Sequence, residues 1–165
     1  MGRSADMTAV TRFGWIAYGL AAGVIVLDQV TKHWIVTQLA MGQSMPIFGP
    51  LTFTLVENPG VSYGLLQSHS AWARWGLVVF AFGVGGVLAF TVRKASRWIT
   101  AISLGLIIGG AVGNPIDRIT QGAVIDFINF SDLHFPWVFN IADSAITVGV
   151  MLLIVEAVLP PRRAT

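Results

Sequence analysis

Four long apolar stretches dominate this sequence, at residues 13–34, 75–92, 98–116 and 141–159. Each is long enough to cross a bilayer as a helix, which takes about 17–25 residues, and a helix satisfies its own backbone hydrogen bonds in lipid. Only 11% of the residues are charged, whereas an ordinary soluble domain has roughly 25%. We therefore expect an all-α membrane protein in which residues 1–165 form a single domain around a bundle of four transmembrane helices.

The lysines and arginines indicate which ends of these stretches share a side of the membrane. Seven of the ten lie before the first stretch, between the second and third, or after the fourth: Arg3, Arg12, Arg93, Lys94, Arg97, Arg162 and Arg163. With four spans these three places fall on one side, which the positive-inside rule identifies as the cytoplasm. We expect both termini there. The net charge of +2 then reflects topology, and no nucleic-acid partner is expected.

Polar side chains gather on the opposite side. Six of the eight acidic residues lie there with four asparagines: Asp28, Glu57, Asp117, Asp126, Asp132, Asp143, Asn58, Asn114, Asn129 and Asn140. Ionisable residues at membrane depth are costly and tend to be functional. The non-cytoplasmic face is therefore the expected working face.

Two short segments on this face have the pattern of β-structure. Residues 46–62 contain the alternating run LTFTLV at 51–56, which predicts a strand or a hairpin. Residues 122–128 form a short β-branched apolar segment, either a strand or a stretch that dips into the membrane interface.

Two of the acids are candidates for chemistry. Asp126 lies in an apolar segment without a local partner, and Asp143 follows Asn140 by three positions at the start of the fourth stretch. An asparagine with an acid three residues later also fits helix capping, so a structural role for Asp143 stays open. Two facing carboxylates, however, share one proton and divide the roles of general acid and general base. Such a pair needs no metal, thiol or serine, and the chain has no cysteine and three scattered histidines.

Other polar residues have local explanations beside functional ones. Asp28 precedes Lys32 by four positions, which fits an ion pair along one helix face. Asp117 beside Arg118 is either a surface pair of little energetic value or a carboxylate that holds Arg118 toward a ligand.

The third stretch carries small residues at a four-residue period, Gly105, Gly109 and Gly113, which let helices pack closely. Close packing brings the polar end of this stretch against its neighbours. Pro115 biases Asn114 away from helical geometry, so we expect the helix to end or kink there.

Five motifs in this chain resemble those of the bacterial lipoprotein signal peptidase (signal peptidase II) family. They read DQVTK at 28–32, NPGVSYG at 58–64, GGAVGNPIDR at 109–118, VIDF at 124–127 and FNIADS at 139–144. All five stand in the family's order and spacing. Two positions depart from its pattern, because Pro115 replaces an apolar residue other than proline and Tyr63 replaces the commoner phenylalanine.

The resemblance implies a membrane aspartyl peptidase with four transmembrane helices, a small periplasmic β-cradle and a short periplasmic helix. It places the catalytic pair on Asp126 and Asp143. It also implies that four residues line the substrate site, Asn58, Asn114, Arg118 and Asn140, and that five support it, Asp28, Lys32, Asp117, Gly60 and Gly110. The family uses no metal and no cofactor.

The implied reaction removes the signal peptide from a diacylglyceryl-modified prolipoprotein by cleaving the amide before the lipidated cysteine. The expected partners are this precursor and membrane lipids, and the enzyme is expected to be a monomer. The implied location is the bacterial inner (cytoplasmic) membrane, crossed several times, with the active site near the periplasmic face.

Three other functions compete with this interpretation. A small proton- or ion-coupled transporter also places aspartates in a membrane, but it predicts polar residues through the full thickness. A lipid-modifying transferase that binds Mg²⁺ needs clustered carboxylates, and the acids here are dispersed. A purely structural protein would use Asp143 as a helix cap and would leave Asp126 without a role.

Overall fold

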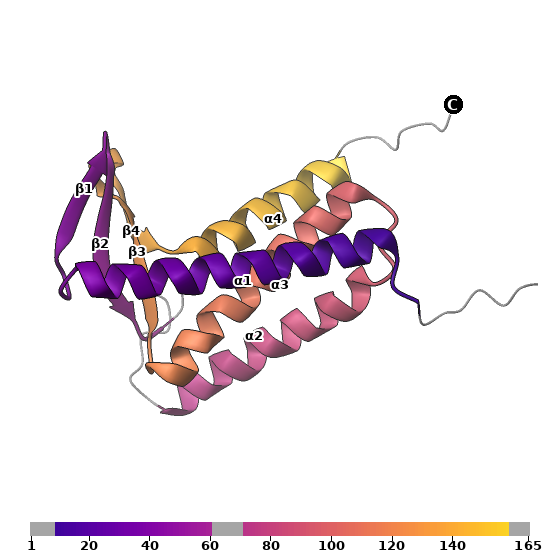
Figure 1. Cartoon of the computed structure of the whole chain (residues 1–165), viewed down its shortest axis with the longest axis horizontal. Coiled ribbons are helices and arrows are strands. Elements are labelled where there is room, and N and C mark those ends of the chain that lie inside the picture. Colours follow the sequence, from indigo (N-terminus) through magenta and orange to yellow (C-terminus); the bar gives the residue numbers. More distant parts are fainter. Residues whose placement is uncertain (1–8, 61–70, 159–165) are drawn as a thin grey trace, which may run out of the picture.

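The structure is a computed structural model that describes residues 9–60 and 71–158. Its long helices are α1 (Arg12–Gln38), α2 (Ala71–Val92), α3 (Trp98–Thr120) and α4 (Ile141–Val158). All four are long and apolar enough to cross a membrane. They form a bundle with a small sheet at one end (Figure 1). The predicted fold class is therefore confirmed in its main features.

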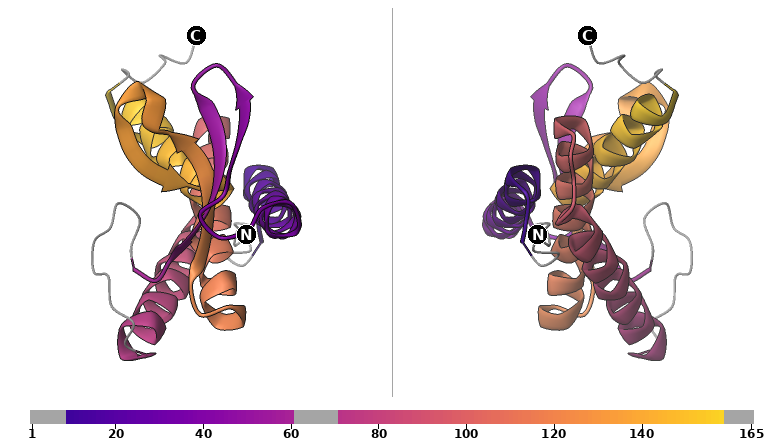
Figure 2. Two further views of the ribbon diagram at one scale, coloured as in Figure 1. Left: turned by 90° about the vertical axis from the view of Figure 1, so that its left-hand side faces the viewer. Right: turned by 90° about the vertical axis from the view of Figure 1, so that its right-hand side faces the viewer.

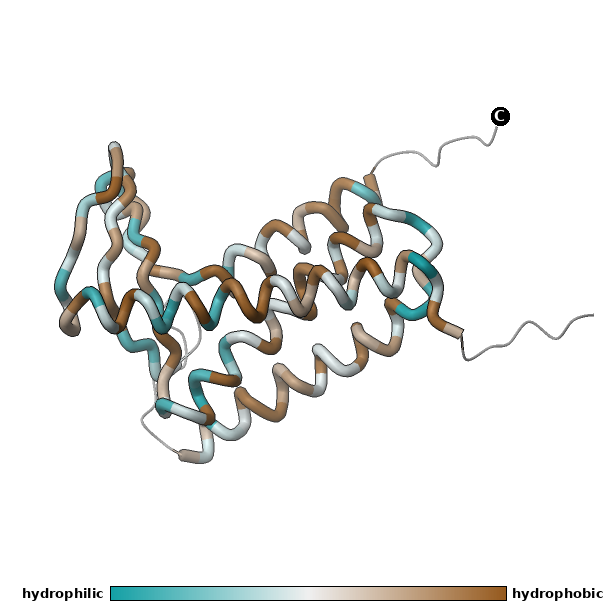
Figure 3. Tube along the Cα trace, in the orientation of Figure 1, coloured by the Kyte–Doolittle hydropathy of each residue, from teal (hydrophilic) through white to brown (hydrophobic). Residues whose placement is uncertain are grey.

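The outward faces of the helices are apolar, as expected of a membrane protein. The residues of α1 that are buried recur every three or four positions, so they form one stripe whose middle faces α3: Gly14, Ala17, Ala21, Val24, Asp28, Lys32 and Ile35. Large apolar side chains such as Trp15, Val26 and Val30 point outward from the same helix. Hydrophilic residues concentrate toward the two ends of the bundle, and the middle of the helices is apolar (Figure 3).

Helix α3 is the centre of the bundle because it packs against α1, α2 and α4. Its glycines permit this. A Cβ at Gly105 would lie 2.7 Å from the Ala17 carbonyl oxygen of α1, and one at Gly109 would lie 2.8 Å from that of Ala21. Gly110 faces the other way, and its Cβ would collide with Ala142 of α4. The glycine spacing therefore predicted close packing correctly. Seen end-on, α2 and α4 diverge from each other (Figure 2).

The sheet has four antiparallel strands in the order β1 (Ser44–Phe48), β2 (Leu51–Asn58), β3 (Val124–Phe130) and β4 (Phe135–Phe139). Strands β1 and β2 form the hairpin predicted within residues 46–62, and β3 is the strand expected within 122–128. A single 3-10 turn, η2 (Ser131–Leu133), connects β3 to β4. In the register of the sheet, Asp126 on β3 lies opposite Val56 on β2.

The sheet rests on an extension of α1. This helix has 27 residues, or about 40 Å at roughly 1.5 Å per residue, which exceeds the roughly 30 Å of a bilayer core. A cluster of buried apolar residues joins its last turns to the sheet: Ile35, Leu39, Leu55, Ile125 and Phe127. Strand β3, and Asp126 with it, is thus held against the helical bundle.

The opposite end of the bundle collects the basic loops. Thr11 at the start of α1 donates through its hydroxyl to the Ala95 carbonyl between α2 and α3, at 2.7 Å. Arg97 pairs with Glu156 near the end of α4, at 2.9 Å. The start of α1, the α2–α3 connection and the end of α4 therefore share one end, as the charge pattern predicted. Arg3, Arg162 and Arg163 lie outside the described residues.

The helix boundaries correct one expectation. We expected the third helix to end or kink at Asn114; it does not end there, because α3 contains Pro115 and continues to Thr120. Proline removes one backbone hydrogen bond within a helix, and here the last turn is held instead by buried bonds of Asp117, described below. The short periplasmic helix implied by the family stays a prediction, because the described residues contain only η2 besides the four long helices.

Candidate functional site

Asp126 is buried among the polar residues at the end of the bundle that carries the sheet. It sits on β3, between β2 and β4, with a 2% exposed surface. The Asn58 amide donates to its Oδ2 at 3.0 Å, and the Asn140 amide donates to its Oδ1 at 2.6 Å. Burial, reinforced by the negative charge of Asp143, raises the pKa of Asp126 to about 7, against the opposing effect of the two amide donors. Asp126 is therefore poised to hold or release a proton near neutral pH.

Asn140 links this acid to the second one. It precedes α4, and its Oδ1 accepts a hydrogen bond from the Asp143 backbone N–H at 3.0 Å. An asparagine at this position satisfies one of the otherwise unpaired N–H groups of the helix start. The capping interpretation of Asn140 is therefore correct. It is also incomplete, because the other side of the same amide bonds Asp126.

Asn114 holds the second acid from α3. Its Nδ2 donates to Asp143 Oδ1 at 2.8 Å, and its Oδ1 accepts from the Asn140 amide at 3.0 Å. Asn114 and Asn140 thus connect Asp143 on α4 with Asp126 on β3. The two acids, 17 positions apart in the sequence, belong to one hydrogen-bonded cluster.

A buried cation lies beneath this cluster. Lys32 Nζ contacts Asp28 at 2.8 Å, Asp117 at 2.7 Å and the side-chain oxygen of Asn114 at 3.0 Å. Each of the three charged side chains is at most 2% exposed. The predicted pair of Asp28 and Lys32 is confirmed, and Asp117 is its third member.

Asp28 and Asp117, the two acids that contact Lys32, also position neighbouring elements. Asp28 Oδ1 accepts the backbone N–H of Ala142 in the first turn of α4, at 2.9 Å, so α1 caps α4. Asp117 Oδ2 accepts the backbone N–H of Ile125 on β3, at 3.3 Å. Gln29 completes the network by donating to Asp117 Oδ1 at 2.9 Å. The sequence analysis missed Gln29, although it lies within the DQVTK motif.

Arg118 is buried beside the acids. Its Nη2 donates to the backbone carbonyl of Gly60, and its charge interacts with Asp143, Asp126 and Asp117. The interpretation of Asp117 and Arg118 as a surface pair is therefore wrong, because both side chains are buried and the ion-pair partner of Asp117 is Lys32. The rest of the NPGVSYG motif beyond Gly60 lies outside the described residues.

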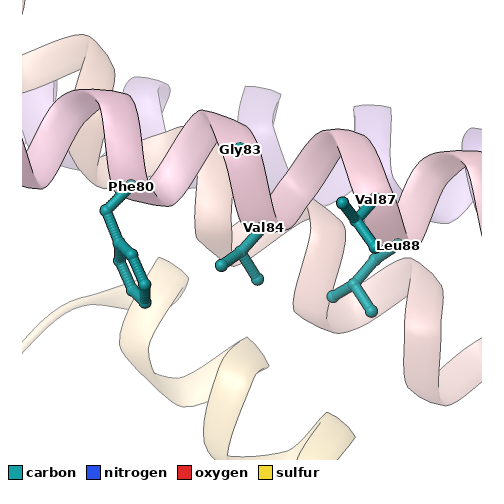
Figure 4. Close-up of a pocket in the computed structure, with 5 residues that line it drawn as sticks. All are labelled: Phe80, Gly83, Val84, Val87 and Leu88. Carbon is teal, nitrogen blue, oxygen red and sulfur yellow. The ribbon is translucent and has the colours of Figure 1, made fainter.

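An open pocket of about 240 Å³ reaches Asp143 from the side of the bundle. Polar and small residues of α3 and α4 form its inner wall, and apolar residues of α2 form the outer one: Asn114, Arg118, Asp143, Gly110, Leu77, Phe80 and Ala81. A second, apolar pocket of about 370 Å³ shares Phe80 and continues along α2. Figure 4 shows Phe80, Val84 and Leu88 projecting from α2 into it. Together they form an apolar groove that leads to Asp143 from the lipid-facing side.

Metal binding has no obvious place here. Residues 9–60 and 71–158 contain no group of three or more histidine, cysteine or acidic side chains arranged to hold a metal ion. Within these residues the polar side chains of the site are instead bonded to one another and to the backbone.

The fold and the site define a class: a four-helix membrane protein with buried acids beneath a small sheet. The model of the signal peptidase (SPase) II family matches residues 20–159. A lipoprotein signal peptidase of Caulobacter vibrioides is 52% identical over 154 residues, covering 92% of this chain and 91% of the relative. One of Hydrogenovibrio crunogenus is 41% identical over 148 residues, covering 87% and 86%.

Solved structures agree with this relationship. A bacterial membrane enzyme determined by the in meso method at 2.3 Å resolution superposes with a TM-score of 0.80 at 27% identity, covering 95% of this chain and 98% of that one. A second, at 1.9 Å resolution, has a TM-score of 0.76 at 30% identity, covering 92% and 97%. This chain belongs to the signal peptidase II family, a family of membrane aspartyl proteases. The transporter alternative is not supported.

Proposed function

We propose that this enzyme removes the signal peptide from diacylglyceryl-modified prolipoproteins, and that Asp126 and Asp143 are its catalytic pair. The observation that carries the assignment is the connection of buried Asp126 with half-buried Asp143 through Asn140 and Asn114. Asp143 opens onto a groove that is apolar along α2. A substrate that is partly an apolar helix and partly lipid can approach such a site laterally from the bilayer.

The chemistry follows from the difference between the two acids. With a pKa of about 7, Asp126 retains a proton that it can deliver to the scissile carbonyl oxygen as water attacks. Asp143 lies in the first turn of α4, where the positive end of the helix favours a carboxylate. It takes a proton from the attacking water. Water adds to the carbonyl carbon and gives a tetrahedral diol. As the diol collapses, Asp143 passes the proton taken from water to the leaving nitrogen, and Asp126 takes back a proton from a diol hydroxyl. The C–N bond before the lipidated cysteine then breaks without an acyl-enzyme, and both acids return to their starting protonation.

The surrounding polar residues divide into two groups. Asn58, Asn114 and Asn140 orient the pair, because their amides already bond the two carboxylates. Arg118 holds the extended peptide, since its Nε makes no hydrogen bond with the described part of the chain and the residue lines the pocket at Asp143.

The orientation follows from the two ends of the bundle. The start of α1 and the α2–α3 connection, which carry Arg12, Arg93, Lys94 and Arg97, lie at the end away from the sheet. Basic residues in short loops favour the cytoplasm. We therefore place both termini in the cytoplasm, the protein in the bacterial inner membrane, and the acids near the periplasmic face.

A gel-shift cleavage assay with a lipidated precursor tests the proposal. Asp126→Asn and Asp143→Asn should each abolish cleavage while the proteins still insert and elute as folded species in detergent. Asp132→Asn is the matched control, because this acid is exposed on η2 of the same sheet, and it should cleave at the wild-type rate. Appreciable turnover by either of the first two variants would refute the pair.

A further inference from the structure

A third pocket lies at the other end of the bundle, away from the acids. It has a volume of about 470 Å³ and lies between the end of α2 and the first turns of α3, lined by Phe90, Thr91, Lys94, Ala95, Ser96, Thr100 and Leu104. Its lining includes the polar side chains of Thr91, Lys94, Ser96 and Thr100, and Phe90 and Leu104 provide apolar surface. The catalytic proposal gives this pocket no role.

The charge around the pocket is unbalanced. The described part of this end carries Arg12, Arg93, Lys94 and Arg97 against Glu156 alone, which is four cations against one carboxylate. That carboxylate is already occupied, because Arg97 pairs with it at 2.9 Å and the Thr100 hydroxyl donates to it at 2.9 Å. In the described part of the chain the ion pairs involve Lys32 and Arg97, so Lys94 at the pocket has no carboxylate partner.

The groups around the pocket suit a ligand in which an anionic group is joined to a hydrocarbon chain. Ser96 adds a hydroxyl beside Lys94 in the lining of the pocket. The Arg93 guanidinium lies 3.9 Å over the ring of Phe90, which adds positive charge to the apolar wall. From Ser96 to Leu104 the pocket changes from polar to apolar, in the direction of the membrane interior.

We propose that this pocket binds the headgroup of an anionic phospholipid, with the phosphate at Lys94 and the first part of an acyl chain along Phe90 and Leu104. Basic pockets between transmembrane helices on the cytoplasmic side suit such lipids, and the assignment of this end to the cytoplasmic leaflet rests on the orientation proposed above. The lipid bridges the end of α2 and the first turns of α3, and so stabilises the bundle far from the acids.

Native mass spectrometry and thermal unfolding of the full-length protein test this. The protein is placed in nanodiscs of phosphatidylcholine, with or without phosphatidylglycerol. Wild type should retain one phosphatidylglycerol in preference to phosphatidylcholine, and its Tm should rise with the anionic lipid. Lys94→Gln should weaken retention about fivefold, the effect of roughly 1 kcal/mol per basic residue near the membrane surface. Inorganic phosphate alone should not reproduce the rise in Tm.

Arg12→Gln is the matched control, because it removes one charge from the same end but outside the pocket. It should change retention much less than Lys94→Gln. Equal effects of the two substitutions would mean that the lipid preference comes from diffuse surface charge, and would contradict a specific site. Equal retention of phosphatidylglycerol and phosphatidylcholine by wild type would also contradict it. Precursor cleavage is measured on the same samples, so a failure here leaves the catalytic proposal standing and is distinguishable from its failure.

Discussion

The side-chain amide of Asn140 joins Asp126 to the start of α4, with its nitrogen 2.6 Å from Asp126 Oδ1 and its oxygen 3.0 Å from the Asp143 backbone nitrogen. One residue therefore serves both the stability of the helix and the geometry of the acids. Two substitutions separate these contributions.

Asn140→Ser should keep the cap and lose the bond to Asp126, because serine caps helices about as well as asparagine. We expect stability close to wild type and a 10- to 100-fold lower cleavage rate, from the loss of roughly 1.5–3 kcal/mol for a hydrogen bond to a charged group. Asn140→Ala should lose a similar factor in rate and in addition about 1 kcal/mol of stability. Detergent unfolding and cleavage kinetics measure both. Full activity of the serine variant would contradict the positioning role.

The pH dependence of cleavage should report Asp126. If this residue donates a proton, activity falls as the pH rises through about 7, where Asp126 becomes ionised. Activity should also fall in acid, where the partner that accepts a proton becomes protonated. A bell-shaped profile of kcat/KM is therefore expected, with apparent pKa values that belong to the pair. The range from about pH 6 to about pH 9 extends roughly one unit below and two units above the pKa of Asp126. A cleavage rate that stays constant over this range would contradict the role of Asp126 as proton donor.

Asn58→Ala should shift the alkaline limb of that profile. The Asn58 amide stabilises the charged form of Asp126 and so lowers its pKa. Its removal raises the pKa, and the limb should move to higher pH by about one unit, since one unit corresponds to roughly 1.4 kcal/mol. Asn129→Ala is the control, because Asn129 joins the same two strands by bonding Thr54, away from the acids. Its profile should keep the wild-type midpoint.

Lys32→Met should be among the most destabilising substitutions in the bundle. It leaves Asp28 and Asp117 buried without their cation, and breaking a buried pair in this way costs about 3–5 kcal/mol. Arg97→Met breaks a pair whose arginine is 52% exposed, so its cost should be at most about 1 kcal/mol. Unfolding of both variants in the same detergent makes the comparison. Similar losses would show that the burial of Lys32 carries no special cost.

Gly110→Ala should lower activity through packing. The new methyl group would lie 2.6 Å from Ile146 Cγ1 and would meet the Ala142 carbonyl oxygen, so α3 and α4 must separate where Asn114 bonds Asp143. Overpacking of this kind costs about 1–3 kcal/mol. Gly86→Ala has nothing within 4 Å and should be neutral or stabilising by up to about 1 kcal/mol. Cleavage rates and Tm values of the two variants should therefore diverge.

The four spans could be predicted because lipid demands long apolar runs, but their ends depend on tertiary contacts. Helix α1 continues to Gln38 since Ile35 and Leu39 pack beneath the sheet. Helix α3 passes through Pro115 because Asp117 in its last turn bonds Lys32 and the Ile125 backbone. Predictions of helix ends from neighbouring residues in the sequence cannot include either set of contacts.

The sheet and the site also combine features that the sequence predicts with features that depend on tertiary contacts. Strand β4 was not predicted, in part because it contains Pro136, and proline is tolerated at the edge of a sheet, where β4 lies. The spacing of Asp28 and Lys32 predicted their ion pair, whereas the contact of Lys32 with Asn114 joins residues 82 positions apart. Asp126 and Asp143 could be singled out by type and family resemblance. The amide connection between them required the folded structure.

The placement of Asp126 on the sheet and of Asp143 on a membrane helix has a practical consequence. Since no single rigid element carries both acids, their alignment is set by how the sheet is seated on the last turns of α1 and on the start of α4. A detergent that preserves helix content but weakens the packing of the sheet on the helices should abolish activity without unfolding the protein. By the same logic, a compound wedged between sheet and bundle can inhibit without touching either carboxylate.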